Sequence, residues 1–219
     1  MTAAPPARPA KLDHLVYTTP DVAASVAELE ERTGVPVTPG GSHVGKGTRN
    51  AFLAIGPRMY IEVLGPDEFD TAFTGSRRYN LDGLTEPTLL TWCTEPQDLQ
   101  DQAAVARAHG YEPGETLPLS RRKPDGELLE WTLVTHTFGD LANAFGGVVP
   151  FMIDWLDCTH PTAELEQKVT LREFTATHPD AEGTRNALAA MGADLPVNPG
   201  ERPSLTAVFD TPNGQVTLT

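Results

Sequence analysis

Residues 12–18 form a short apolar run that carries one histidine, and apolar residues then recur at helical spacing, which predicts a strand followed by a helix. The apolar positions of residues 21–34 share one helical face, with Asp21 suited to the N-cap and Gly34 to the helix end. Strands follow, the last over residues 59–64, which have typical strand composition. This part of the chain is therefore expected to fold as a strand, a helix and two or three strands.

The same order of elements returns further along the chain, as an internal repeat. Thr94-Glu95-Pro96 repeats Thr18-Thr19-Pro20, and residues 153–156 repeat residues 61–64. The pattern predicts a strand at 88–93, a helix at 98–109, strands at 118–122, 128–135 and 148–156, and a turn at Pro124-Asp125-Gly126.

A third, shorter copy begins at Leu171, with strands expected at 171–177, 205–209 and 215–218. Since three copies do not pair evenly, the third must cover a sheet edge, pack on the first two, or meet another chain, as in a homodimer. The expected organisation is a disordered tail at 1–10, a domain at 11–161 with modules 12–65 and 87–157, and a partial C-terminal βαββ module at 162–219.

Charge indicates which partners are disfavoured, and the cysteines and the first ten residues indicate the compartment. The 219 residues include 30 acidic and 16 basic side chains, a formal net charge of -14, which disfavours binding to nucleic acid or to an anionic membrane. Cys93 and Cys158 form no metal or redox motif and are expected to be free, buried thiols. The first ten residues lack the apolar run of a signal peptide, so a cytoplasmic protein is expected.

Two residues within the repeated strands are candidates for chemistry. Strand alternation places Leu12, His14 and Val16 on one face of the first strand. In the strand at 59–64 it places Tyr60, Glu62 and Leu64 on one face. Glu62 lies in an apolar strand, where an ionised carboxylate needs a cation, a hydrogen-bond partner or water. The pair could line a ligand cavity, or His14 could be a core histidine bonded to a structural carboxylate.

Further polar and aromatic side chains are candidates for substrate contacts. His43 is followed by two glycines that would let the backbone approach a ligand, although a solvated loop histidine fits equally well. Arg121 belongs to the densest basic cluster and could hold a substrate anion, or be a solvated strand-edge charge. The candidate set for substrate binding is His43, Asn50, Trp92, Arg121 and Trp131.

Tandem βαβββ modules that open with Leu12-Asp13-His14 and close on a strand with a carboxylate resemble the vicinal-oxygen-chelate superfamily, the fold of glyoxalase I, fosfomycin-resistance enzymes and extradiol dioxygenases. Residues 43–50 and 150–155, with His160-Pro161, resemble a glyoxalase-like branch of it. The resemblance implies an α+β fold in which the modules form a curved, cup-like mixed sheet around a divalent metal (Zn, Mn, Fe or Mg).

Carried over residue by residue, the resemblance implies His14, Glu62 and Asp154 as metal ligands, while Leu90 stands where a fourth ligand is expected. It implies a lyase or isomerase acting on a small oxygenated metabolite, with Glu62 or Asp154 moving a proton if it is not bound to metal. The alternative is a non-catalytic protein of the same fold that binds or sequesters a small molecule, which Leu90 and the tryptophans favour.

Overall fold

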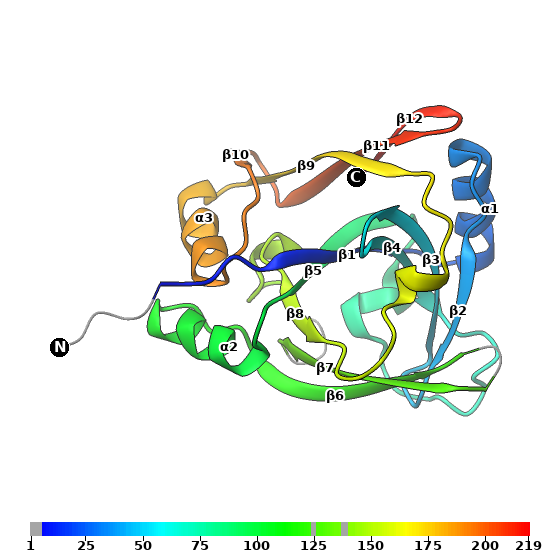
Figure 1. Cartoon of the computed structure of the whole chain (residues 1–219), viewed down its shortest axis with the longest axis horizontal. Helices are drawn as coiled ribbons and strands as arrows, with labels where there is room; N and C mark the ends of the chain where they lie inside the picture. The colour runs from blue at the N-terminus through cyan, green and yellow to red at the C-terminus, as the bar shows by residue number, and fades with distance from the viewer. Residues whose placement is uncertain (1–5, 124–125, 137–139) are drawn as a thin grey trace.

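A computed structural model describes residues 6–123, 126–136 and 140–219. It contains the predicted tandem of strand, helix and three strands (Figure 1). The first module consists of β1 (Lys11–Thr18), α1 (Val22–Thr33), β2 (Thr38–His43), β3 (Thr48–Gly56) and β4 (Met59–Pro66). The second consists of β5 (Thr88–Glu95), α2 (Leu99–Ala108), β6 (Glu115–Arg122), β7 (Leu128–Thr135) and β8 (Phe151–Asp154).

The helices of the two modules begin and end within one residue of the expected positions. The Asp21 carboxylate accepts a hydrogen bond from the backbone N–H of Ala24 and caps α1. Gly34 adopts a left-handed conformation and donates its N–H to the carbonyl of Glu30, which closes the helix. Asp98 caps α2 in the same way as Asp21 caps α1, so the second helix begins one residue later than expected.

The eight strands close into a barrel in the order β1-β4-β3-β2-β6-β7-β8-β5. β1 and β4 run parallel, as do β5 and β8, and the other neighbours are antiparallel. The modules therefore meet at two seams, β1 with β5 and β2 with β6. The expected cup curves far enough to become a closed ring, because both seams are hydrogen-bonded.

A bulge in β1 changes which side chains face the barrel interior. The register of β1 against β5 shifts between Leu12 and His14, so Asp13 has no partner of its own in this pairing. Leu12 packs against the outer hydrophobic core, whereas His14 lines the interior cavity. The expectation that Leu12 and His14 share a face is wrong because simple alternation does not hold across a bulge.

The C-terminal residues form a separate four-stranded sheet with the order β10-β9-β11-β12. Its elements are β9 (Thr170–His178), α3 (Ala181–Ala190), β10 (Val197–Pro199), β11 (Ser204–Thr211) and β12 (Gly214–Leu218). Here the first strand pairs with β10 and β11, whereas β1 pairs with the last strand of its own module. The third copy thus repeats the order of elements but not their pairing.

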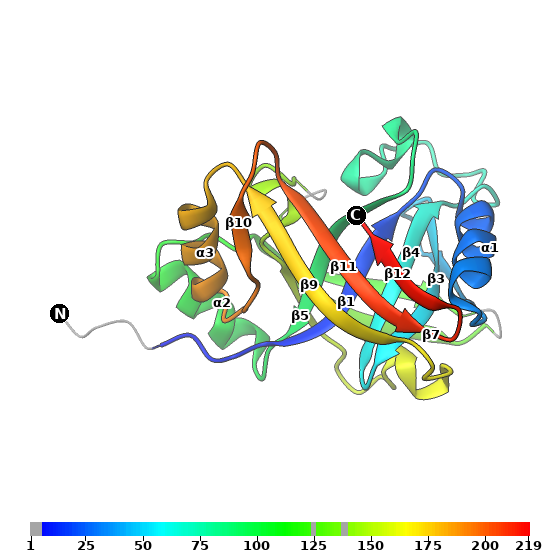
Figure 2. The ribbon, with the colours of Figure 1, turned by 90° about the horizontal axis from the view of Figure 1, so that it is seen from above.

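This second sheet packs on the outside of the barrel, across β1 and β5 (Figure 2). One hydrophobic core joins the two, with Leu15 and Tyr17 of β1 in the same cluster as Leu205 and Phe209 of β11. Trp92 belongs to this outer core, where its ring lies 5.2 Å from that of Phe174. Three arrangements were possible for the third copy, and in this structure it packs against the first two modules.

Parts of two expectations fall outside the described residues. Of the tail expected at 1–10, residues 1–5 lie outside the described part of the chain. At the other end of this tail, the backbone N–H of Ala10 donates to the carbonyl of Gly192. Of the turn expected at Pro124-Asp125-Gly126, residues 124–125 also lie outside the described part of the chain. Within the described parts of the chain, no helix is long and apolar enough to cross a membrane.

Gly41 provides a test of the β2–β6 seam. Its φ is +132°, and a Cβ there would collide with the carbonyl oxygen of Arg122 on β6. We expect Gly41→Ala to lower the free energy of unfolding by about 3 kcal/mol, measured by urea denaturation. Gly110→Ala is the matched control, since it also has positive φ but no atom within 4 Å, and should lose only about 1 kcal/mol. Equal losses in the two variants would contradict the steric account of this seam.

Candidate functional site

The barrel encloses a cavity of about 380 Å³ that opens to solvent and is lined mainly by apolar side chains. Its size lies at the lower end of the range for small-molecule sites. Both modules contribute to the lining. Among its residues are His14, His43, Asn50, Glu62, Arg121 and Trp131.

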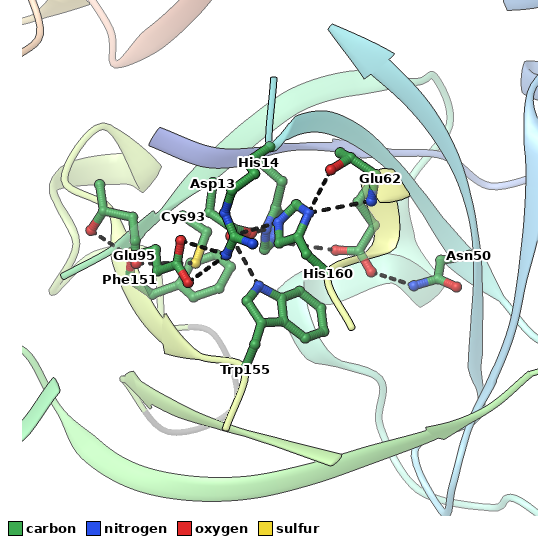
Figure 3. Close-up of polar contacts among 12 residues, drawn as sticks. Asp13, His14, Asn50, Glu62, Cys93, Glu95, Phe151, Trp155 and His160 are labelled. Carbon is green, nitrogen blue, oxygen red and sulfur yellow. Dashed lines mark hydrogen bonds and ion pairs between the residues drawn. The ribbon is translucent and has the colours of Figure 1, made fainter. Parts of the chain in front are cut away.

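Glu62 lies between two histidines on the cavity wall. Its side chain is 13% exposed, with Oε2 3.8 Å from Nε2 of His14 and Oε1 3.8 Å from Nε2 of His43. The amide nitrogen of Asn50 donates to Oε1 over 2.6 Å, as Figure 3 shows. Tyr60 and Leu64 face the cavity with Glu62, while Ile61 and Val63 lie in the outer core, as strand alternation predicts.

His43 is held in one tautomer by two neighbours. The amide nitrogen of Asn50 donates to Nε2 over 3.2 Å, so Nδ1 carries the proton and donates to the hydroxyl of Thr48 over 2.9 Å. Burial lowers the pKa of His43 to about 4, and the cations of Arg121 and Arg78 act in the same direction, against the opposing charge of Glu62. His43 is therefore neutral at physiological pH.

His14 is oriented by Asp13, whose carboxylate is buried. Nδ1 of His14 donates to Oδ1 of Asp13 over 2.5 Å, which leaves Nε2 directed at Glu62. Asp13 Oδ2 accepts hydrogen bonds from the indole of Trp155 over 2.9 Å and from Nε2 of His160 over 3.0 Å (Figure 3). The β1 bulge makes this possible, because it directs Asp13 and His14 to the same side of the strand.

The hydrogen bonds to Asp13 keep it ionised. Burial alone would raise the pKa of its carboxyl, but hydrogen bonds and charges from His14 and His160 outweigh burial and hold that pKa well below its usual value. His160 accepts in turn, at Nδ1, from the hydroxyl of Thr162 over 2.7 Å. Asp13 and its three donors thus form a satisfied buried network beside the cavity.

Asp13, His14 and Cys93 are the group of side chains close enough to share a metal ion within the described residues, with ligand atoms within 4.8 Å of one another. Cys93 is fully buried, and burial raises the pKa of its thiol well above the usual value. Both carboxylate oxygens of Asp13 already accept hydrogen bonds. These hydrogen bonds make the Asp13 carboxylate part of the buried network, in which its role is to orient His14, Trp155 and His160.

Two of the candidate side chains lie away from the cavity. Asp154 is exposed and accepts a hydrogen bond from the backbone N–H of Leu156, because Phe151, Ile153 and Trp155 take the inward positions around it. Trp92 donates its indole N–H to the carbonyl of Val148 in the outer core. The structure therefore does not bring Asp154 together with His14 and Glu62.

The remaining candidates lie together at the cavity. The guanidinium of Arg121 is buried, donates to the carbonyl of Gly40 and lies over the ring of Phe52 at 4.9 Å. Trp131 approaches His43 edge-on, with ring centroids 6.0 Å apart. His43, Asn50, Arg121 and Trp131 thus share one cavity with His14 and Glu62.

Sequence reasoning did not identify several residues that shape the site. Asp13 precedes His14 in the quoted motif, yet alternation assigned it to the other face, and the bulge has no sequence signal that we can identify. Tyr60 stacks on the His14 ring at 4.8 Å; alternation places it on the same face as Glu62, but it was not among the candidate site residues. Arg78 reaches the cavity from the irregular segment between β4 and β5, where periodicity gives no information.

The paired βαβββ modules, closed around a cavity with a histidine on the first strand and a carboxylate on the fourth, define the class as the vicinal-oxygen-chelate superfamily. A family model described as a glyoxalase-like domain matches residues 12–192. The chain belongs to this glyoxalase-like domain family. The family and the cavity together place it among small-molecule enzymes and binding proteins.

One solved structure of low sequence identity shares the fold, and others align with lower scores. A hypothetical protein from Staphylococcus aureus aligns with a TM-score of 0.63 at 15% identity, over 95% of this chain and 84% of its own. Methylmalonyl-CoA epimerase from Mycobacterium tuberculosis aligns with a TM-score of 0.40 at 16% identity, over 65% of this chain and 85% of the epimerase. A variant of the Streptomyces coelicolor epimerase in complex with 2-nitronate-propionyl-CoA aligns with a TM-score of 0.43 at 19% identity, over 68% of this chain and 97% of the epimerase. A comparison with curated proteins gave no match.

The network around Asp13 predicts a pH-dependent loss of stability. We expect Asp13→Asn to lower the free energy of unfolding by about 3 kcal/mol at pH 7, because buried donors lose a charged acceptor. The folded pKa lies below the ordinary value of 3.8, so the stabilisation is complete above that pH and is lost as pH falls through the folded pKa. Urea denaturation at pH 7 and pH 3 should show the native–variant difference shrinking on acidification.

Asp154→Asn is the control for that measurement, since Asp154 is exposed and asparagine can also accept from Leu156. It should change the unfolding free energy by less than about 0.5 kcal/mol. A native–Asp13→Asn difference that is the same at both pH values would contradict the account.

Proposed function

We propose that this chain is a lyase or isomerase of the glyoxalase type that moves a proton on a small oxygenated metabolite bound in the barrel cavity. The observation that carries the proposal is the position of Glu62, a cavity-facing carboxylate with a histidine at each oxygen. A carboxylate in a largely apolar site is a suitable general base, because little water competes for it.

In the proposed reaction Glu62 removes a proton from the carbon beside a substrate carbonyl. The proton goes to Oε2, since Oε1 is engaged by the amide of Asn50, and the C–H electron pair becomes the enolate. If the carbon that loses the proton carries a hydroxyl, the intermediate is an enediolate: the proton returns to the former carbonyl carbon, the hydroxyl proton moves to the other oxygen, and the isomer results. If the next carbon carries a leaving group, the enolate expels it with its bonding electron pair and gives the lyase product. Nε2 of His14 lies 3.8 Å from Oε2, so it takes up the proton only when the two atoms draw closer in the substrate complex, where Asp13 would stabilise the imidazolium that results.

The superfamily implies a divalent metal, and the types of donor at the cavity suit one. In this structure the ligand atoms of His14, His43 and Glu62 do not all lie within 4.8 Å of one another, and Nε2 of His43 accepts from Asn50, so metal binding would require these side chains to move together. Two imidazole nitrogens, of His14 and His43, and one carboxylate, of Glu62, are ligand types that suit Zn, Mn or Fe. The hydrogen bond from His14 to Asp13 is the outer support typical of a metal-binding histidine. When bound, the ion would act as a Lewis acid on a substrate oxygen. Glu62 as a tight ligand would then not be free to act as the base, so the two roles are rivals.

The second candidate is a protein of the same fold that binds a small molecule without transforming it. It is favoured by the closing strand of the second module, which presents Phe151 and Ile153, followed by Trp155, to the cavity where a second carboxylate was expected. Aromatic side chains lie against the histidines, with Phe151 on His14 and Trp131 on His43, and suit retention of an apolar ligand.

Hydrogen–deuterium exchange tests the proposed proton transfer. In D₂O, we expect protein-dependent exchange at the carbon beside the carbonyl in a panel of small hydroxy-ketones, 2-oxo acids and oxo-esters, followed by proton NMR. Glu62→Gln should slow it at least about 100-fold, since general base catalysis contributes on that order. Glu68→Gln, an exposed carboxylate paired with Arg49, should not change the rate. Unchanged exchange in Glu62→Gln would reject Glu62 as the base.

Metal content separates the two candidates. Protein purified without added ions should carry close to one equivalent of a divalent metal by mass spectrometry, and His14→Ala should lose it because one of three donors is gone. Asp154→Ala should retain the metal, since that carboxylate lies outside the cavity. Metal-free native protein that binds panel compounds without exchanging their protons would favour the non-catalytic candidate.

A further inference from the structure

Arg78 reaches the cavity from a conformationally restricted segment. It opens the short 3₁₀ segment Arg78–Gly83 between β4 and β5, and its side chain lines the cavity together with that of Tyr79. The two residues that follow it, Tyr79 and Asn80, have φ values of 59° and 53°, in the left-handed region. Consecutive non-glycine residues rarely adopt this region unless the surrounding structure requires it, and such segments cluster at ligand sites.

The polar contacts of Arg78 leave part of its guanidinium unsatisfied. Nη2 donates to the hydroxyls of Tyr79 and Thr135, each over 3.2 Å. Nε is buried and has no hydrogen-bond acceptor. The guanidinium carbon lies 4.9 Å from the centre of the Tyr79 ring, which orients the group without neutralising it.

Arg78 also lacks a carboxylate partner within 4.0 Å among the described residues, although acidic side chains far outnumber basic ones. Its chain neighbour Arg77 is paired with Asp82 at 2.5 Å, so carboxylates are available in this segment. An unneutralised arginine with an unused buried donor is therefore suited to an anion supplied by a ligand.

The remainder of the cavity indicates what the anion is attached to. Trp131, Phe151 and Trp155 form an aromatic wall, which favours a flat or branched apolar body. Glu62 lies in the same cavity, and its negative charge disfavours a doubly charged phosphate more than a singly charged carboxylate. The overall charge of -14 acts in the same direction.

We propose that the cavity selects a small carboxylate with an apolar or aromatic body, and that Arg78 binds its carboxylate. This inference rests on the proposed function, in that the ligand occupies the same cavity as Glu62, and it names the substrate class. A carboxylate held at Arg78 fixes one end of the ligand, so the rest of it is confined between Glu62 and the aromatic wall.

The probes are 3-phenylpropanoate, its uncharged amide 3-phenylpropanamide, and phenethyl phosphate, with binding measured by calorimetry and by the fluorescence of the cavity tryptophans. The native protein should bind the carboxylate at least tenfold more tightly than the amide or the phosphate. Arg78→Met should weaken carboxylate binding at least tenfold and change amide binding less than twofold. Arg78→Lys should retain part of the preference, since it keeps the charge but not the planar pair of donors.

Arg58→Met is the matched control, because it removes one arginine charge at an exposed pair with Glu95 and should leave all three affinities unchanged. Equal binding of carboxylate and amide, tighter binding of the phosphate, or no binding of any probe would overturn the proposal. If circular dichroism shows that Arg78→Met does not fold, the proposal is tested with Arg78→Lys alone. A carboxylate preference in Arg78→Lys equal to that of the native protein would then overturn the proposal.

These outcomes are distinguishable from failure of the proposed reaction. Carboxylate binding that depends on Arg78, without hydrogen–deuterium exchange, rejects the reaction and supports the ligand class. Exchange that depends on Glu62, with no carboxylate preference, supports the reaction and overturns the ligand class.

Discussion

The buried carboxylate of Asp13 is the interaction on which the site depends. It accepts hydrogen bonds from His14 in its own strand, from Trp155 after β8, and from His160 in the segment that follows. A buried charge is tolerated only when its lone pairs are satisfied, so these three partners must all be in place. Because Trp155 lies at the end of the second module and His160 in the segment after it, the Asp13 network ties the orientation of His14 to the docking of both modules.

The cavity formed by this docking has an unequal division of chemistry between its walls. Both modules supply aromatic side chains, but the first alone supplies Glu62, both histidines and Asn50, while the second supplies Arg121. The internal repeat thus preserves the backbone but not the reactive groups. This asymmetry suits a ligand with one reactive end and one apolar end, since each wall can hold a different part of it.

The third unit stabilises the barrel from outside and leaves the cavity to the first two. Its sheet lies across β1 and β5, and its apolar residues join the core formed by the outward face of β1. That core holds Leu15 and Tyr17, which alternate with the inward residues His14 and Val16. Packing on the outer face of β1 therefore constrains the strand that presents His14 to the interior.

The sequence by itself determined the order of elements, the helix caps and the inward face of β4, because periodicity and capping are local properties that residue types express directly. It also indicated Glu62, since a carboxylate in an apolar strand requires a partner. Only the tertiary structure decided that Asp13 joins His14, that Asp154 points outward and that Arg78 reaches the cavity. A bulge, the register of a short strand and the path of an irregular segment depend on contacts between distant parts of the chain, and local sequence patterns do not encode those contacts.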